Sequence, residues 1–171
     1  KHIKQLKGTI KKKVKNVKRD VAIELAQQSK NMILKKLSSN WINESLKAKY
    51  SYHFESLGIP IIQYPQDMIA MQELIWEIKP DLIIETGIAH GGSLIMNASM
   101  LTMLDVCEAI ELNKNINPKK SKRKVLGIDI DIRSHNRREI EKHPMYSRIE
   151  MIEGSSIDPQ IIEIVKKESK N

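Results

Sequence analysis

From residue 64 onward, the spacing of apolar residues predicts alternating helices and strands. Between residues 64 and 80, apolar side chains recur every three or four positions, as they do on the buried face of a helix. That face is expected to carry Met68, Met71, Ile75 and Ile78. Pro80 ends this helix, and the wholly apolar run 82–84 that follows predicts a buried strand.

The alternation continues to the end of the sequence. Residues 94–112 are apolar on nearly every face, which predicts a largely buried helix with Ser93 as its N-cap. The remaining predicted elements are a polar loop at 113–124, strands at 124–131 and 148–154, a short polar helix at 132–142 and a last helix from about 159. The buried side of that last helix is expected to carry Ile161, Ile162 and Val165. This order predicts an α/β fold whose parallel strands, joined by right-handed crossovers, lie in the spatial order 3-2-1.

The N-terminal part has a weaker pattern. Residues 1–19 are rich in lysine with sparse apolar residues, and a helix is predicted from Asp20 to about Leu37, ended by the Ser-Ser-Asn sequence at 38–40. Residues 41–62 are predicted to form a mixed connecting segment with a turn near Gly58. The chain is therefore divided into a basic N-terminal helical segment, 1–40, and an α/β domain, 41–171.

Composition narrows the class of protein. Apolar residues make up 40% of the chain, enough for a core and too many for disorder. Cys107 is the single cysteine, which favours a reducing compartment, and we expect a cytoplasmic protein without a secretory leader. The net charge of +8 is concentrated at 1–19 and 114–124, but aromatic residues, at 4%, are not interleaved with it, which argues against nucleic acid as a partner. Weak contact of the basic N-terminus with a membrane surface stays open.

The stretch from Glu85 to Ser93 is where the sequence predicts chemistry. It follows a predicted strand and precedes a predicted helix, and Gly87, Gly91 and Gly92 let backbone approach a ligand closely. A glycine-rich turn between a parallel strand and a helix N-terminus is typical of nucleotide sites. The sequence therefore predicts a nucleotide-type ligand at this turn.

Three such ligands can be compared with the turn. A P-loop needs a lysine before its Ser or Thr to neutralise phosphates, and Gly92 stands in that position, which argues against ATP and GTP. A dinucleotide fingerprint needs G-x-G-x-x-G, and Ala89 replaces the middle glycine, so NAD is only an alternative. S-adenosylmethionine has no phosphate and fits better.

Residues at three predicted strand ends match the parts of S-adenosylmethionine. Glu85 suits its cationic part, and backbone N–H groups at Gly91–Ser93 suit its carboxylate. Asp129 is expected to hold the ribose hydroxyls, with Asp131 as the reserve candidate. The adenine is expected to be bordered by Gly154, Ser155 and Ser156. His90 either contacts the cofactor or acceptor or is a turn residue without chemistry.

These residues lead to a resemblance. The sequence Glu-Thr-Gly-Ile-Ala-His-Gly-Gly-Ser at 85–93, preceded by Gln72-Glu73 and Lys79-Pro80-Asp81, resembles the cephalosporin hydroxylase-like methyltransferases, which include rhamnosyl O-methyltransferases. The segments 127–131 and 153–156 are also similar to that family, and the resemblance covers roughly 52–165. It implies a Rossmann-like class I methyltransferase sheet. The cofactor it implies is S-adenosylmethionine, held by Glu85, Gly87, Gly91, Gly92, Ser93 and Asp129.

The resemblance also implies a small hydroxylated acceptor such as a sugar, as in polysaccharide biosynthesis. Two departures from the family stand out. Asp129 follows Gly87 at about twice the roughly 20-residue spacing usual for such fingerprints. The sequence also stops after the third strand and its helix, whereas the family's Mg²⁺ carboxylates and catalytic residues lie in a later part. We therefore assign no metal ligand and no catalytic residue, and expect this chain to supply a cofactor half-site.

An incomplete sheet has a further consequence. The first core strand would leave an unpaired edge, so we expect either a fragment of a longer protein or a homo-oligomer. The rival interpretation is a Rossmann-like binding or scaffold module without catalysis, with an NAD-dependent enzyme as a weaker alternative. Ligand binding that depends on Asp129 separates these hypotheses.

Overall fold

The computed structural model describes residues 20–169, and the chain divides into two compact units after Ala48. The first unit contains a helix at 20–28 and helix α2 (Met32–Lys47). The predicted helix end at 38–40 is wrong, because the break lies at 29–31, where the Asn31 side chain accepts a hydrogen bond from the Leu34 amide and caps α2. The predicted division after residue 40 therefore falls inside a helix. Serine and asparagine inside α2 cost at most about 0.7 kcal/mol each, so they do not stop the helix.

The second unit begins with a short hairpin that the sequence analysis did not predict. After a 3-10 turn at Tyr50–Tyr52, strands β1 (Phe54–Ser56) and β2 (Ile59–Ile61) pair antiparallel. Leu57 and Gly58 form the connection, both with positive φ, as a type I′ hairpin turn requires. The predicted connecting segment is therefore partly a hairpin.

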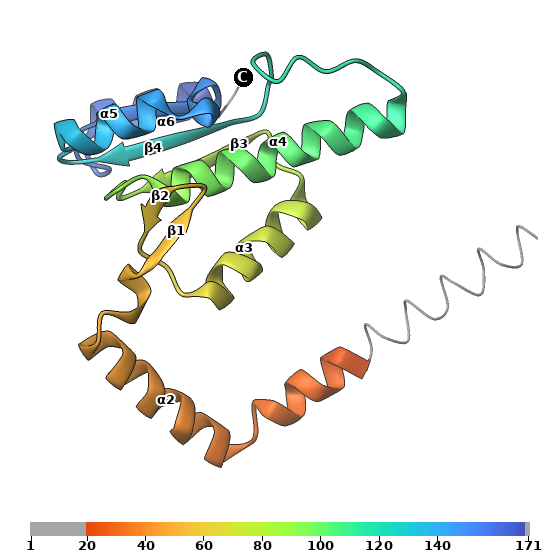
Figure 1. Ribbon diagram of the computed structural model, residues 1–171, viewed down its shortest axis with the longest axis vertical. Coiled ribbons are helices and arrows are strands. Elements are labelled where there is room, and N and C mark those ends of the chain that lie inside the picture. The colour runs from red at the N-terminus through yellow and green to blue at the C-terminus, as the bar shows by residue number, and fades with distance from the viewer. Residues whose placement is uncertain (1–19, 170–171) are drawn as a thin grey trace, which may run out of the picture. The chain divides into compact units, whose positions relative to one another are not determined.

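The rest of the second unit alternates as predicted, and Figure 1 shows the elements in order. They are α3 (Pro65–Ile78), β3 (Leu82–Thr86), α4 (Gly92–Leu112), β4 (Lys124–Asp129), α5 (Ser134–Lys142), a 3-10 turn at Pro144–Arg148, β5 (Ile149–Glu153) and α6 (Pro159–Glu168). β3, β4 and β5 form a parallel sheet in that spatial order, which confirms the predicted α/β fold and strand order. Within residues 20–169, β3 has a strand partner on one side only.

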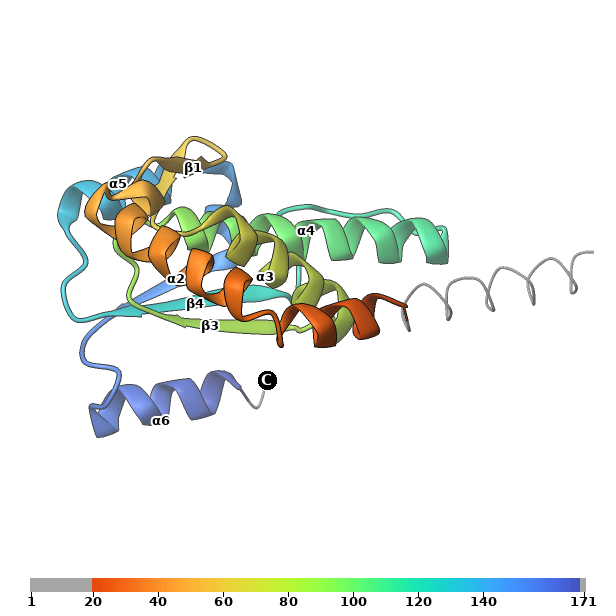
Figure 2. The ribbon, with the colours of Figure 1, turned by 90° about the horizontal axis from the view of Figure 1, so that it is seen from below.

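Helices cover both faces of the sheet, with α6 on the side opposite α4 (Figure 2). The larger core lies under α4, where Leu94, Ile95 and Leu101 are fully buried together with Val125 of β4. On the other face, Ile161 of α6 packs on β4. The core therefore holds the carboxyl ends of the strands rigidly beside the start of α4.

Some predicted core positions are exposed. On α3 only Ile75 is buried, while Met71 and Ile78 are 38% and 67% exposed. Ile162 of α6 is likewise exposed. The first half of α4 is buried as predicted, but its C-terminal end runs past the sheet and leaves Ile110 exposed. By length and composition alone α4 could cross a membrane, a test that core helices of soluble proteins also pass.

A cluster of charged side chains links α4 to the residues that precede β4 and β5, at the amino end of the sheet. Arg123, just before β4, and Arg148, just before β5, are each 3% exposed, and both donate to the Asp105 carboxylate of α4. Arg123 also makes two hydrogen bonds to Glu108, of 2.8 and 2.9 Å. The polar loop at 113–123 is thus anchored where it enters the sheet, at the end opposite the predicted site.

Candidate functional site

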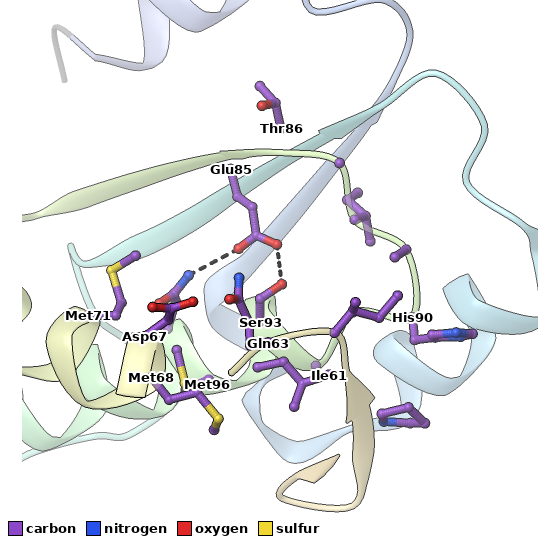
Figure 3. Close-up of a pocket in the computed structure, with 18 residues that line it drawn as sticks. Ile61, Gln63, Asp67, Met68, Met71, Glu85, Thr86, His90, Ser93 and Met96 are labelled. Carbon is purple, nitrogen blue, oxygen red and sulfur yellow. Dashed lines mark hydrogen bonds between the residues drawn. The ribbon is translucent and has the colours of Figure 1, made fainter. Parts of the chain in front are cut away.

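The glycine-rich turn lies where the strands end, beside a cavity of about 410 Å³. The cavity lies between the start of α3, the end of β2, the turn after β3 and the first turns of α4. Figure 3 shows Glu85 projecting into it from β3, with Asp67, Met68 and Met71 on one side. Because the strands are parallel, the ends of β3, β4 and β5 meet at this edge, with Asp129 paired to Glu153 in register.

Glu85 is held by two side chains from α4. The Ser93 hydroxyl donates to one carboxylate oxygen, and the Asn97 amide donates to the other at 3.0 Å. Burial raises the pKa of Glu85, and these two hydrogen bonds counteract only part of that effect. The prediction that Ser93 caps α4 is wrong: Gly91 is the N-cap, and the Ser93 hydroxyl donates a hydrogen bond to Glu85 instead.

The three glycines of the turn have different environments. A Cβ on Gly91 would lie less than 3.0 Å from two Ile140 side-chain atoms, and one on Gly92 less than 3.0 Å from the Pro60 carbonyl oxygen. These two glycines therefore let α5 and the hairpin pack against the turn. A Cβ on Gly87, at φ +85°, would meet nothing within 4 Å, so Gly87 is the one that borders open space.

Asp129 holds the turn from the end of β4. Its carboxylate accepts hydrogen bonds from the amides of Ile88, at 2.6 Å, Ala89, at 3.4 Å, and Asp131, at 3.2 Å. Burial alone would raise the pKa of Asp129, but hydrogen bonds from backbone amides outweigh burial and hold it below its ordinary value. From α5, Asn136 donates to the Ala89 carbonyl at 2.7 Å, so the turn is fixed from two sides.

A second cavity of about 360 Å³ lies on the α5 side of the turn. Asp129, Asp131 and Arg133 line it, together with Tyr52 from the start of the unit. His90 lines both cavities, so the turn separates two adjoining spaces. The predicted residues on β3 and β4 are therefore brought together around the turn.

The predicted adenine segment is placed differently. The Gly154 amide donates to the Asp129 carbonyl at 2.8 Å, so this glycine lies beside the end of β4. Ser155 and Ser156 line neither of the two cavities described above. The Ser155 carbonyl instead accepts from the Asp158 amide at 2.9 Å, at the start of α6. Their contact with adenine stays a prediction.

The structure adds residues that the sequence analysis missed. Asn97 lies four positions after Ser93, one helical turn on, so that spacing could have indicated it. Asp67 and the methionines Met68 and Met96 line the first cavity, but they belong to other elements or to the apolar face of α4, and no local pattern marks them. Asn136, which fixes the turn, is separated from Ala89 by 47 positions in the sequence.

The lining of the first cavity contains acidic side chains but no lysine or arginine to pair with them. The acidic side chains are those of Glu85 and Asp67. Among residues 20–169, no group of three or more His, Cys, Asp or Glu side chains is placed to hold a metal ion. An anionic cavity lined by methionine suits a ligand with a cationic and partly apolar end.

Comparison with known proteins places the chain in a family. Residues 48–171 match the family model described as rhamnosyl O-methyltransferase/CmcI. A solved structure titled "cmcI-N160 SAH" is 17% identical, with a TM-score of 0.41, and the match covers 66% of this chain and 57% of that one. This chain thus spans less than two thirds of that protein's length. Comparison with curated proteins gives no match. Since the family model matches most of the sequence, the chain belongs to the rhamnosyl O-methyltransferase/CmcI family.

Proposed function

We propose that this chain is the cofactor-binding part of an S-adenosylmethionine-dependent O-methyltransferase. The observation that carries the proposal is Glu85, a partly buried carboxylate that faces the first cavity and has neutral hydrogen-bond donors but no cation among the lining residues. Asp129 and Asp131 border the adjoining cavity across the turn. One cavity therefore suits the cationic methionine end of the cofactor and the other its ribose.

The residues present have defined roles in this proposal. When bound, S-adenosylmethionine would supply its sulfonium methyl group to an acceptor oxygen: an oxygen–carbon bond would form in line as the carbon–sulfur bond breaks, leaving S-adenosylhomocysteine. Glu85 binds and orients the cationic end, while Asp129 and Asn136 keep the turn in one conformation. Gly87 leaves room for the ligand beside the backbone. The acceptor's proton must pass to a group that we do not assign here.

A divalent ion such as Mg²⁺ is a separate part of the proposal, which rests on the resemblance to the family. Such an ion would bind the acceptor oxygen and lower its pKa. Glu85 and Asp67 are the acidic residues that line the first cavity, and they do not form a group of metal ligands among the described residues. The described residues therefore supply no metal-dependent step.

Calorimetric titration tests the cofactor assignment. S-adenosylmethionine and NAD are titrated in parallel into the folded chain, into Asp129→Asn and into the control Asp81→Asn, which changes an exposed carboxylate at the other end of the sheet. We expect saturable binding of S-adenosylmethionine only, weakened by Asp129→Asn and unchanged by the control. Binding of NAD alone would favour the dehydrogenase alternative, and binding of neither ligand would favour a scaffold module.

The acceptor is a separate proposal. We infer a sugar hydroxyl, and the support is the family's description as rhamnosyl O-methyltransferases. The test is transfer of isotope-labelled methyl from S-adenosylmethionine to a rhamnoside by the full-length protein, with a fully O-methylated rhamnoside as the control. Transfer to a phenol or an amine, but not to the sugar, would contradict this choice.

We also infer that the outer edge of β3 pairs with a further strand, supplied by the longer protein or by a second copy. Within the described residues that edge has no strand partner, and Ile84 is 42% exposed. Hydrogen exchange on β3 amides, combined with the mass of the particle in solution, tests this. A monomer whose outward β3 amides exchange rapidly would count against it.

A further inference from the structure

Asn97 is a polar residue on the buried face of an otherwise apolar helix. Its neighbours Leu94, Ile95 and Ala98 are fully buried and apolar, and Asn97 itself is 3% exposed. Its amide nitrogen donates to Glu85, while its amide oxygen is buried without a hydrogen-bond partner in the described part of the chain. The carboxylate fixes this orientation, since the reverse would set oxygen against oxygen.

Packing alone does not explain this asparagine. A buried acceptor without a partner destabilises the folded state, and an apolar residue of similar shape, such as leucine, would avoid that penalty. The favourable contact that Asn97 makes is with Glu85. The benefit of an amide at this position is therefore to be sought in the state and orientation of that carboxylate.

The hydrogen bonds to Glu85 leave its charge available. Ser93 and Asn97, both on α4, donate to different carboxylate oxygens, and Figure 3 shows Glu85 at the cavity with the Ser93 side chain beside its carboxylate. Both donors are neutral, so they favour the ionised form without cancelling its charge. Charged and titratable groups that also line the cavity are Asp67 and His90. A fixed carboxylate with no cationic partner in this lining is a suitable site for an ammonium group.

We propose that Asn97 and Ser93 are positioning residues that hold ionised Glu85 to receive the α-ammonium of S-adenosylmethionine. The inference rests on the proposed function and adds to it the two residues that fix the Glu85 carboxylate. Asn97 acts through Glu85: its oxygen has less than 1 Å² of exposed surface and is not offered as a ligand contact.

The test pairs a protein change with a ligand change. S-adenosylhomocysteine and its deamino analogue, in which hydrogen replaces the α-ammonium, are titrated into the unmodified chain and into Asn97→Leu. We expect Asn97→Leu to weaken S-adenosylhomocysteine binding about tenfold or more, the effect of losing a hydrogen bond to a charged group. Binding of the analogue is expected to change less than about twofold, and thermal unfolding is expected to be unchanged or shifted upward.

Further variants separate positioning from a general effect on the fold. Ser93→Ala is expected to reproduce the selective loss and Ser93→Thr, which keeps the hydroxyl, to restore binding; Ser99→Ala, on the same helix, serves as the control. Removing a donor raises the pKa of Glu85, so the pH at which S-adenosylhomocysteine binding is half-maximal is expected to rise in Asn97→Leu. Asp67 and His90 are present in both proteins, so the difference between the two proteins reports Glu85.

Two results would overturn the inference in different ways. Equal losses for S-adenosylhomocysteine and the deamino analogue would show that Asn97 supports the fold of the site and not ammonium recognition, while the proposed function would stand. Failure of the unmodified chain to bind S-adenosylhomocysteine at all would overturn the proposed function, and the inference with it.

Discussion

Replacing Gly91 by alanine should destabilise the fold, because α5 packs directly against the turn at this glycine. Gly91 has φ +91°, in the left-handed region, and an added Cβ would lie less than 3.0 Å from Cδ1 and Cγ1 of Ile140. Ile140 has no exposed surface, so it has little space to move into. The substitution therefore meets both backbone strain and overpacking.

The magnitude can be separated into these two parts. Left-handed backbone costs an alanine about 1–2 kcal/mol, and overpacking in a filled core costs about 1–3 kcal/mol. Gly91→Ala should therefore lower the free energy of unfolding by about 2–5 kcal/mol. Gly87→Ala meets strain of the same kind at φ +85° but no neighbour within 4 Å, so it should cost only about 1–2 kcal/mol.

A double-mutant cycle with Ile140→Ala isolates the contact. Ile140→Ala removes both atoms that would lie within 3.0 Å of the new Cβ, and alone it should cost about 2–5 kcal/mol through the cavity it leaves. Urea unfolding of the single and double variants, followed by circular dichroism, gives the four free energies. The double variant should be more stable than the sum of its parts by about 1–3 kcal/mol, the size of the relieved overpacking.

The matched cycle uses Gly87→Ala with Ile140→Ala and should be additive within about 0.5 kcal/mol. Additivity in the Gly91 cycle would refute the reasoning, because the clash with Ile140 would then contribute nothing. So would an equal cost for the two glycine substitutions.

Three further predictions concern stability and binding. Asp105→Asn should lower the free energy of unfolding by about 3–5 kcal/mol, measured in urea, because it leaves two buried arginines without their shared carboxylate. Although burial alone would raise it, hydrogen bonds from Ser121 and the two arginines hold the pKa of Asp105 below its ordinary value of 3.8. The stability that the ionised carboxylate contributes is therefore fully present above pH 3.8 and is lost as the pH falls through the lowered pKa. In Asp105→Asn, the free energy of unfolding should fall less steeply with acid, as measured by urea unfolding at a series of pH values. Asp129→Asn should accelerate hydrogen exchange at the Ile88 amide, and unchanged protection would contradict its role in holding the turn. Leu126→Ala, at a fully buried position under α6, should cost about 2–5 kcal/mol in urea, and a loss below about 1 kcal/mol would contradict the packing of α6 on the sheet.

Much of the fold could be predicted because it depends on local patterns. Isoleucine-rich runs bounded by Pro80 and glycine marked the strands, and their alternation with helices fixed the parallel order. The hairpin at 54–61 was missed because its strands have three residues each and Leu57 occupies a positive-φ position usually taken by glycine or asparagine. Likewise, the exposure of Ile78 depends on how α3 packs, which helical periodicity alone does not determine.

The residues of the candidate site also fall into those that could be predicted from the sequence and those that could not. Glu85 and Asp129 could be predicted because each ends a strand, and strand ends of a parallel sheet meet at one edge. The roles of Gly91 and Gly92 could not, because Ile140 and Pro60, the residues their missing side chains accommodate, are distant in sequence. The function of Ser93 was mistaken because a serine before a helix is a good N-cap, and only the position of Glu85 shows that its hydroxyl has another partner.

The buried carboxylates at the two ends of the sheet differ in their partners. At the amino end, the Asp105 carboxylate accepts from two buried arginines, so charge is compensated within the fold and the cluster stabilises the entry of β4 and β5. At the carboxyl end, Glu85 receives only neutral donors and no lysine or arginine lines its cavity, although the chain has 29 such residues. Asp105 is paired with cations inside the fold, whereas Glu85 is not. The cavity at Glu85 therefore keeps an electrostatic preference for a cationic ligand. That contrast within one sheet supports a cationic cofactor more directly than the glycines of the turn, since two of the three are accounted for by packing.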